Sequence, residues 1–181
     1  ILMKDEFHKV MKIWINNRTI EVTGSGYEPK GVFSLQDKLL VAEAFSNDSL
    51  DLLFRTAVLC NTAKLVPPSE AQNYWNVIGD PTEGALLTLA QKAGFDCERH
   101  RQDCPAVKRF PFESVRKRMS SINRLADGSL RVFVKGAPKE VLELSTKIIL
   151  DQNTVKLTSA EKSEITAQLD DFAEDGLRIL G

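Results

Sequence analysis

The stretch VIGDPTEGALLTLAQKAG, residues 77–94, constrains the fold more than any other part of the sequence, because it marks both ends of a helix. Asp80 is a favourable N-cap, Pro81 suits the first helical position, and Glu83 completes an Asp-x-x-Glu variant of the capping box. Gly94 offers a left-handed stop, and the apolar positions at helical spacing are Leu86, Leu89, Ala90 and Ala93. The pattern predicts a helix from about Pro81 to Ala93. Capping alone would explain these polar residues, so the stretch does not by itself indicate a binding site.

Length and composition limit the class of protein. The chain has 181 residues, 43% of them hydrophobic, which predicts a single domain over residues 1–181, or one domain with an appended subdomain. Its 24 basic and 25 acidic residues leave a net charge of -1, which argues against a nucleic-acid-binding surface spread over the molecule. No run approaches the roughly eighteen apolar residues of a membrane span, and no signal peptide opens the chain. We therefore expect a soluble body.

The three cysteines give no firm metal or disulfide motif. Cys60, Cys97 and Cys104 form no CxxC pair, and an odd number favours a reducing compartment over a disulfide framework. Cys97, His100 and Cys104 have the spacing C-x2-H-x3-C, which could in principle hold a metal. Three ligands without an evident fourth make a weak zinc motif, so we assign no metal ligand.

The remaining patterns predict strands paired as hairpins with helices between them. Residues 11–22 alternate around an Asn-Asn turn, residues 23–31 form a loop, and residues 48–63 carry a buried helical stripe. Asp127-Gly128 predicts a hairpin whose second strand is Leu130–Lys135, and helices follow from Pro138 and from near Thr158, which has its own capping box. Val141, Leu142 and Leu144 are expected on the buried side of the first of these helices. Ile165, Leu169, Phe172 and Ala173 are expected to point inward from the second, and a last strand is expected in LRIL. The fold class is therefore α+β, with a largely antiparallel twisted sheet flanked by helices.

Two segments have the composition of a site for an aromatic anion. In FPFESVRKRMS, Phe110 and Phe112 precede three basic residues that could attract phosphates. In VFVKGAP, Lys135 ends a strand, and Gly136 lets a ligand approach the backbone next to a helix N-terminus. Each segment also has an ordinary interpretation, as core phenylalanines, a solvated basic edge or a strand-to-helix turn. P-loop, His-Glu-x-x-His and Gly-x-Ser-x-Gly motifs do not occur in the sequence.

Taken together, GDPTEGALL, FESVRKRMS, VKGAPKEVL and DGLRIL, with CNTAKL upstream, resemble the nucleotide-binding (N) domain of P-type cation-transporting ATPases, in the calcium-pump-like (type II) branch. The resemblance covers essentially the whole chain. It implies a domain excised from a larger membrane pump, with hinge strands near both termini and a cytoplasmic location. The implied partners are ATP or ADP and the phosphorylation, actuator and transmembrane domains of the same full-length chain. Mg²⁺ would enter with ATP, bound mainly by the phosphorylation domain.

The resemblance also implies roles for individual residues. The implied nucleotide-binding residues are Asp80, Thr82, Glu83, Phe112, Lys117, Met119, Lys135, Gly136, Ala137 and Arg178. Phe112 would stack on the purine, Glu83 would reach the exocyclic amino group and Lys135 would lie at the base of the pocket. Lys117 would lie beside ribose and phosphates, and Arg178 would hold phosphate oxygens.

Some features of the resemblance limit what this chain can do. Relatives often carry arginine where this chain has Ser114, which puts the phosphate contacts in doubt and leaves Arg116 as a candidate substitute. No residue is assigned to catalysis, and we expect the isolated chain to be monomeric and to hydrolyse no ATP. We also expect Glu83→Gln to weaken binding with little loss of fold.

Two other classes stay open at this stage. One is a freestanding enzyme acting on a nucleotide or phosphometabolite, and the other is a non-catalytic protein-interaction domain. The basic segments 99–101 and 116–118 leave a faint indication of nucleic-acid binding, which the balanced net charge argues against.

Overall fold

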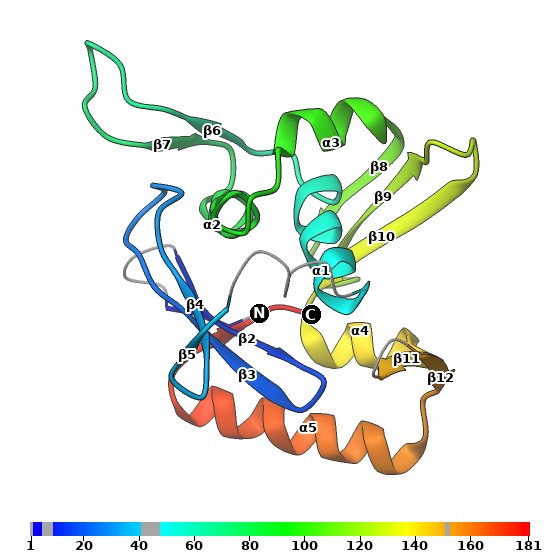
Figure 1. Cartoon of the computed structure of the whole chain (residues 1–181). Coiled ribbons are helices and arrows are strands. Elements are labelled where there is room, and N and C mark those ends of the chain that lie inside the picture. The colour runs from blue at the N-terminus through cyan, green and yellow to red at the C-terminus, as the bar shows by residue number, and fades with distance from the viewer. Residues whose placement is uncertain (1, 5–8, 41–47, 151–152) are drawn as a thin grey trace.

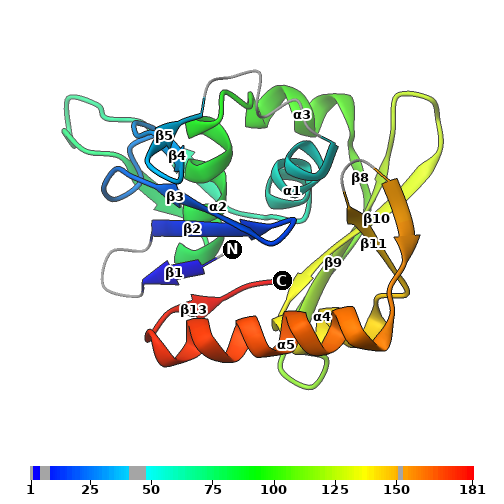
Figure 2. The same cartoon turned by 60° about the horizontal axis from the view of Figure 1, so that its bottom comes forward.

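Two antiparallel sheets pack on different sides of helix α1 in the computed structural model, which describes residues 2–4, 9–40, 48–150 and 153–181 (Figures 1 and 2). The larger sheet has the strand order β13 (Arg178–Ile179), β1 (Leu2–Lys4), β2 (Lys9–Ile15), β3 (Arg18–Val22), β4 (Phe33–Leu35) and β5 (Lys38–Leu39). The smaller sheet has the order β10 (Leu130–Gly136), β9 (Arg118–Arg124) and β8 (Ala106–Glu113). Two further hairpins pair β6 (Lys64–Val66) with β7 (Asn76–Ile78) and β11 (Lys147–Leu150) with β12 (Asn153–Lys156). The helices are α1 (Asp48–Leu59), α2 (Pro81–Lys92), α3 (Cys97–Asp103), α4 (Pro138–Leu144) and α5 (Ser159–Glu174).

The predicted α+β class with antiparallel pairing is confirmed, although the pairing is divided among several sheets. In the hairpin of β2 and β3, the local sequence pattern was sufficient to predict the turn and the pairing. Asn16 and Asn17 both adopt positive φ, 50° and 55°, as a two-residue hairpin turn requires. The turn sets Ile13 opposite Ile20, and both side chains are buried.

Helices α1 and α2 cover the larger sheet and form the main core with it. Phe54 and Val58 of α1 are fully buried, and Leu86 and Leu89 of α2 lie in the same cluster. Phe33 of β4 meets Phe54 edge to face, with ring centroids 6.2 Å apart. Helix α1 ends at Leu59, earlier than the predicted stripe, because the chain turns into an extended segment toward β6.

The smaller sheet packs on the C-terminal end of α1 through a second cluster. This cluster contains Leu59 of α1 and the following Cys60, Met119 of β9, Phe133 of β10 and Cys104. Met119 lies opposite Lys135 in the β9–β10 register, so both side chains face α1. The register places the end of β10 against the helix pair, and this is where the candidate site lies.

The C-terminal helices follow their predicted starts but bury fewer residues than expected. Thr158 and Glu161 form the complete capping box of α5, and Leu169 and Phe172 are buried. Leu144 is 58% exposed and Ala173 is exposed, so their predicted inward orientation is wrong. The reason for Leu144 is that α4 has seven residues and buries none of them completely.

Strand β1 pairs with β13, which places the two ends of the described chain side by side (Figure 1). Ile1 and residues 5–8, part of the expected N-terminal hinge, lie outside the described residues. Within the described part of the chain, no helix is both long enough and apolar enough to cross a membrane.

Candidate functional site

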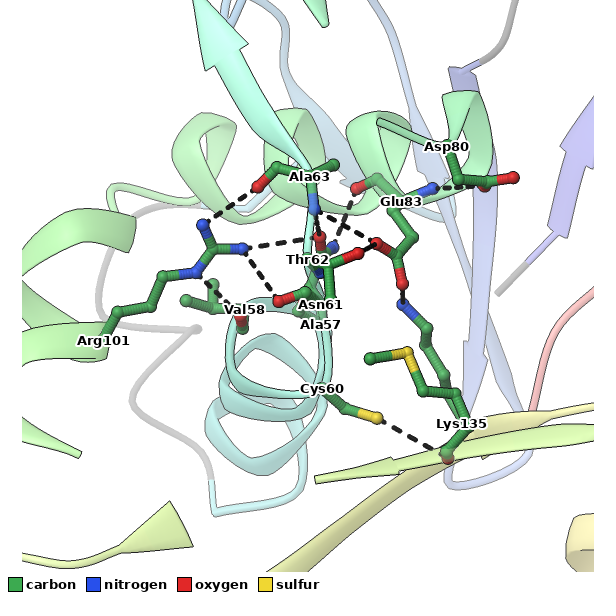
Figure 3. Close-up of polar contacts among 11 residues, drawn as sticks. Ala57, Val58, Cys60, Asn61, Thr62, Ala63, Asp80, Glu83, Arg101 and Lys135 are labelled. Atoms are coloured by element: carbon green, nitrogen blue, oxygen red, sulfur yellow. Dashed lines mark hydrogen bonds and ion pairs between the residues drawn. The ribbon is translucent and has the colours of Figure 1, made fainter. Parts of the chain in front are cut away.

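A buried ion pair joins the first turn of α2 to the end of β10 (Figure 3). Lys135 Nζ lies 2.7 Å from Glu83 Oε1, and the side chains are 11% and 10% exposed. The two residues are 52 positions apart in sequence. Helix α2 presents Glu83 because Asp80 caps its N-terminus, and strand β10 presents Lys135 because its register with β9 points that side chain toward α1 and α2.

The Glu83 carboxylate also accepts hydrogen bonds from the segment that follows α1. Oε2 accepts from the Thr62 amide at 2.8 Å, the Thr62 hydroxyl at 2.7 Å and the Ala63 amide at 3.1 Å. Oε2 therefore accepts three donors, whereas Oε1 accepts one, from Lys135. The first half of the predicted capping box is confirmed, because Asp80 accepts from the Glu83 amide at 3.1 Å. The reciprocal half is wrong, because the carboxylate is directed at Thr62, Ala63 and Lys135 instead of the Asp80 amide.

Burial shifts the pKa of the Glu83 carboxyl in one direction, and the neighbouring charge and hydrogen bonds shift it in the other. Burial by itself would raise the pKa of Glu83, but the Lys135 ammonium and the donors of Thr62 outweigh it and lower the pKa below 4.5. Beside the pair, burial raises the pKa of the Cys60 thiol to about 11 despite the nearby ammonium. The site therefore holds an ionised carboxylate and a neutral thiol at physiological pH.

Backbone pairing at the end of β10 brings several predicted site residues together. Gly136 and the C-terminal Gly181 exchange two backbone hydrogen bonds, of 2.9 and 3.0 Å. The Ala137 amide donates to the Lys117 carbonyl at 2.9 Å. A Cβ on Gly136 would collide with the Lys117 carbonyl and come within 2.7 Å of Arg118 Cα, so this close approach of the two backbones requires glycine. Lys117, Met119, Lys135, Gly136 and Ala137 thus lie at one corner of the smaller sheet.

Phe112 and Phe110 have different environments, although both lie in β8. Phe112 is 64% exposed, so its ring is accessible for stacking. A β-bulge between Phe110 and Glu113 separates them and reorients the side chains locally. Phe110 is half-buried, with Lys108 Nζ at 5.0 Å and Arg116 at 6.0 Å from its ring centroid.

The remaining predicted residues, and the side chain of Lys117, differ in exposure and in their partners. Asp80 is exposed and Thr82 half-buried in the first turn of α2, next to Glu83. Lys117 has a φ of 50° and pairs with Glu140 at 2.6 Å. Arg178 is exposed on β13, and its strand leads to the Gly181 that pairs with Gly136.

Arg116 is poorly placed to replace the arginine that relatives often have at the position of Ser114. Its Nε bonds Glu113, and its Nη2 donates to the Pro111 carbonyl at 3.1 Å. Both partners lie at the end of β8, next to the turn that contains Arg116. The guanidinium is therefore engaged locally, and Ser114 itself is exposed.

A cavity of about 420 Å³ adjoins Lys135 on the side facing α1. Its walls are mostly apolar, and its lining includes Trp14, Leu53, Val134 and Leu180. Lys135 is the member of the predicted site that lines it, and all ten predicted residues are among those the structure describes. The Lys135 side chain therefore borders an apolar space and also contacts Glu83.

Sequence reasoning missed the residues that hold Glu83. Asn61 is 1% exposed and donates to the Ala57 and Glu83 carbonyls, both at 2.9 Å. Arg101 of α3 donates to the same segment. CNTAKL contributed to the family resemblance, but nothing in it indicates which residue Thr62 or Asn61 contacts.

The Cys97, His100 and Cys104 spacing does not converge on one point. Cys97 lies in the main core, Cys104 lies in the second cluster, and His100 stacks on Phe95 with centroids 4.9 Å apart. No group of three or more potential metal-ligating side chains occurs in the described ranges.

The sequence matches the protein family described as P-type ATPase, cytoplasmic domain N, over residues 49–181, and the chain belongs to this family. It is 34% identical to a calcium-transporting ATPase of Bacillus subtilis, over 94% of this chain and 19% of that protein. It is also 34% identical to the cation-transporting ATPase pma1 of Synechocystis, over 94% of this chain and 18% of that protein. The endoplasmic reticulum calcium ATPase srcA of Aspergillus fumigatus is 27% identical over 89% of this chain. The resemblance to the calcium-pump-like branch is confirmed, and the chain spans about a fifth of the length of these relatives.

Proposed function

We propose that this chain binds ATP and presents its γ-phosphate to an aspartate in the phosphorylation domain of a longer cation-transporting pump. Membership of the N-domain family and similarity to proteins named calcium- and cation-transporting ATPases support this proposal. The chain's own task would be positioning, because phosphoryl transfer depends on alignment and charge stabilisation. The pump would be a membrane protein with this domain on its cytoplasmic side.

The buried Glu83–Lys135 pair is the observation that carries the proposal. Lys135 has three N–H donors, and Glu83 is its acceptor among the described residues, so donors remain for ring nitrogens of a base. Oε1 of Glu83 accepts from Lys135 and keeps a lone pair for an exocyclic amino group, whereas Oε2 already accepts three donors. The pair therefore offers both a donor and an acceptor to a purine, in an environment that strengthens hydrogen bonds.

Phe112 would supply the stacking surface, and Gly136 would leave room for the ring beside the backbone. Lys117 and Arg178 would face the ribose and phosphates, where Lys117 would exchange Glu140 for a phosphate oxygen. Mg²⁺ would arrive bound to the phosphates, with its protein ligands in the phosphorylation domain.

The test is a titration of the 181-residue chain with ATP, ADP and GTP, followed by amide NMR shifts and calorimetry. We expect shifts at Glu83, Phe112, Lys135 and Gly136, and tighter binding of adenine than guanine nucleotides. Phe112→Ala should weaken ATP binding by about 5- to 150-fold, because base stacking contributes about 1–3 kcal/mol.

Tyr74→Ala is a matched control, since Tyr74 is 62% exposed and lies in the β6–β7 loop, which projects away from the β8–β10 sheet (Figure 1). Equal losses in both variants, or no shift with any nucleotide, would refute the proposal. Turnover of ATP by the chain alone would favour a freestanding enzyme.

A further inference from the structure

The guanidinium of Arg101 binds the carbonyl groups around the C-terminal end of α1 (Figure 3). Nε donates to Val58 O at 3.2 Å, Nη1 to Ala63 O at 2.9 Å, and Nη2 to Asn61 O at 3.3 Å. The last carbonyls of a helix have no partners within the helix, so a cation there satisfies acceptors and opposes the negative end of the helix dipole. A planar guanidinium holds its donors in a rigid, widely spread fork that bridges three such carbonyls, whereas an ammonium concentrates its donors at one point.

The segment that Arg101 holds is the one that supplies the donors to Glu83. Residues 61–63 present two amides and one hydroxyl to its carboxylate. Asn61 fixes the same segment from inside, because its Oδ1 accepts from the Ala63 amide at 2.9 Å and its Nδ2 donates to Glu83 O. The contacts form one continuous chain from α3, through the end of α1, to the ion pair at β10.

We infer that Arg101 is a positioning residue that orients the Glu83–Lys135 pair through residues 61–63, and through that pair sets nucleotide affinity. The second part rests on the proposed function. Arg101 lies within the basic segment 99–101, which the sequence linked faintly to nucleic acid. Its guanidinium turns inward, whereas neighbouring Arg99 is 77% exposed and pairs with Asp103 at 3.6 Å on the same helix.

The experiment compares Arg101→Gln and Arg101→Lys with the control Arg99→Gln in the whole 181-residue chain. The measurements are the pH titration of the Glu83 carboxyl carbon by NMR, the amide shifts of Thr62 and Ala63, and the Kd for ATP. The charged groups near Glu83 are Lys135 on β10, Arg101 on α3 and Asp80 at the N-cap of α2, and the Cys60 thiol lies just after α1. Arg101→Lys keeps the charge and removes the fork, so it separates positioning from a through-space charge effect.

We expect both Arg101 variants to shift the Thr62 and Ala63 amides, to raise the pKa of Glu83 toward its ordinary value and to weaken ATP binding. The loss for Arg101→Gln should be about tenfold or more, by analogy with the loss at metal sites when a residue that holds a ligating side chain is removed. Arg101→Lys should fall between Arg101→Gln and the wild type, and Arg99→Gln should match the wild type. If Arg101→Gln does not fold, Arg101→Lys still decides the question.

The inference is overturned if Arg101→Lys behaves as the wild type, or if Arg101→Gln leaves the titration of Glu83 and the two amides unchanged. It is also overturned if Arg99→Gln has the same effects as Arg101→Gln. If the wild-type chain binds no nucleotide, the proposed function fails, and the titration of Glu83 still tests the positioning of the ion pair.

Discussion

Replacing Glu83 by Gln should cost more stability than replacing Lys135 by Met, although both changes break the same ion pair. In Glu83→Gln, the single amide oxygen can accept either from Lys135 or from Thr62 and Ala63. The NH₂ group then points at the donors that the oxygen does not accept from, so two donors face each other. The better arrangement keeps the contacts with Thr62 and Ala63, and it leaves the Lys135 ammonium buried without an acceptor.

The expected magnitudes follow from what remains after each change. An uncompensated buried charge costs about 3–5 kcal/mol, and both side chains are buried enough for this range to apply. Lys135→Met removes one hydrogen bond to the carboxylate and leaves three donors on it, which should cost about 1.5–3 kcal/mol. In the Glu83→Gln background, Lys135→Met should be neutral or stabilising, because it removes the unpaired ammonium.

Urea unfolding at pH 7, followed by circular dichroism, would measure these differences as free energies of unfolding. The reasoning fails if Glu83→Gln lies within 1 kcal/mol of the wild type. It also fails if Lys135→Met destabilises the wild-type and Glu83→Gln backgrounds equally. The sequence suggested that Glu83→Gln would spare the fold, and the four donors on the carboxylate lead to the opposite expectation.

Two further predictions concern stability in acid and the close approach of the Gly136 backbone to Lys117 and Arg118. Because the pKa of Glu83 is lowered below 4.5, the stability that the ion pair contributes should be complete above about pH 4.5 and disappear as the pH falls through the lowered value. The difference in free energy of unfolding between wild type and Lys135→Met, measured from pH 7 to pH 3, should shrink only in acid; a constant difference would contradict this. Gly136→Ala should destabilise the domain by about 1–3 kcal/mol, because its Cβ would press on the backbone of Lys117 and Arg118. If Gly136→Ala is as stable as the wild type in urea, the backbones of Gly136 and of Lys117 and Arg118 can move apart without a loss of stability, and this reasoning is wrong.

Local signals in the sequence determined the parts of the fold that depend on neighbouring residues. Asp80 and Pro81 started α2, the Thr158 capping box started α5, and Asn16-Asn17 turned the first hairpin. Each of these depends on contacts within about four residues, so a single sequence contains all the information needed. Family motifs then identified the domain and its candidate site residues, although the roles of those residues stay predictions.

Tertiary structure decided the parts that depend on distant segments. The family resemblance placed Glu83 and Lys135 in one pocket, but the sequence does not indicate that they form an ion pair, that Thr62 binds Glu83 or that Arg101 holds residues 61–63. Such contacts arise only when α1, α2, α3 and β10 pack together, because a buried carboxylate takes whichever donors the surrounding elements place around it. The sequence also did not predict α3 or the hairpins β6–β7 and β11–β12, because these elements are too short to show a clear hydrophobic periodicity. The sequence alone thus determined where α2, α5 and the first hairpin begin and which family the chain belongs to, and packing decided which side chains meet.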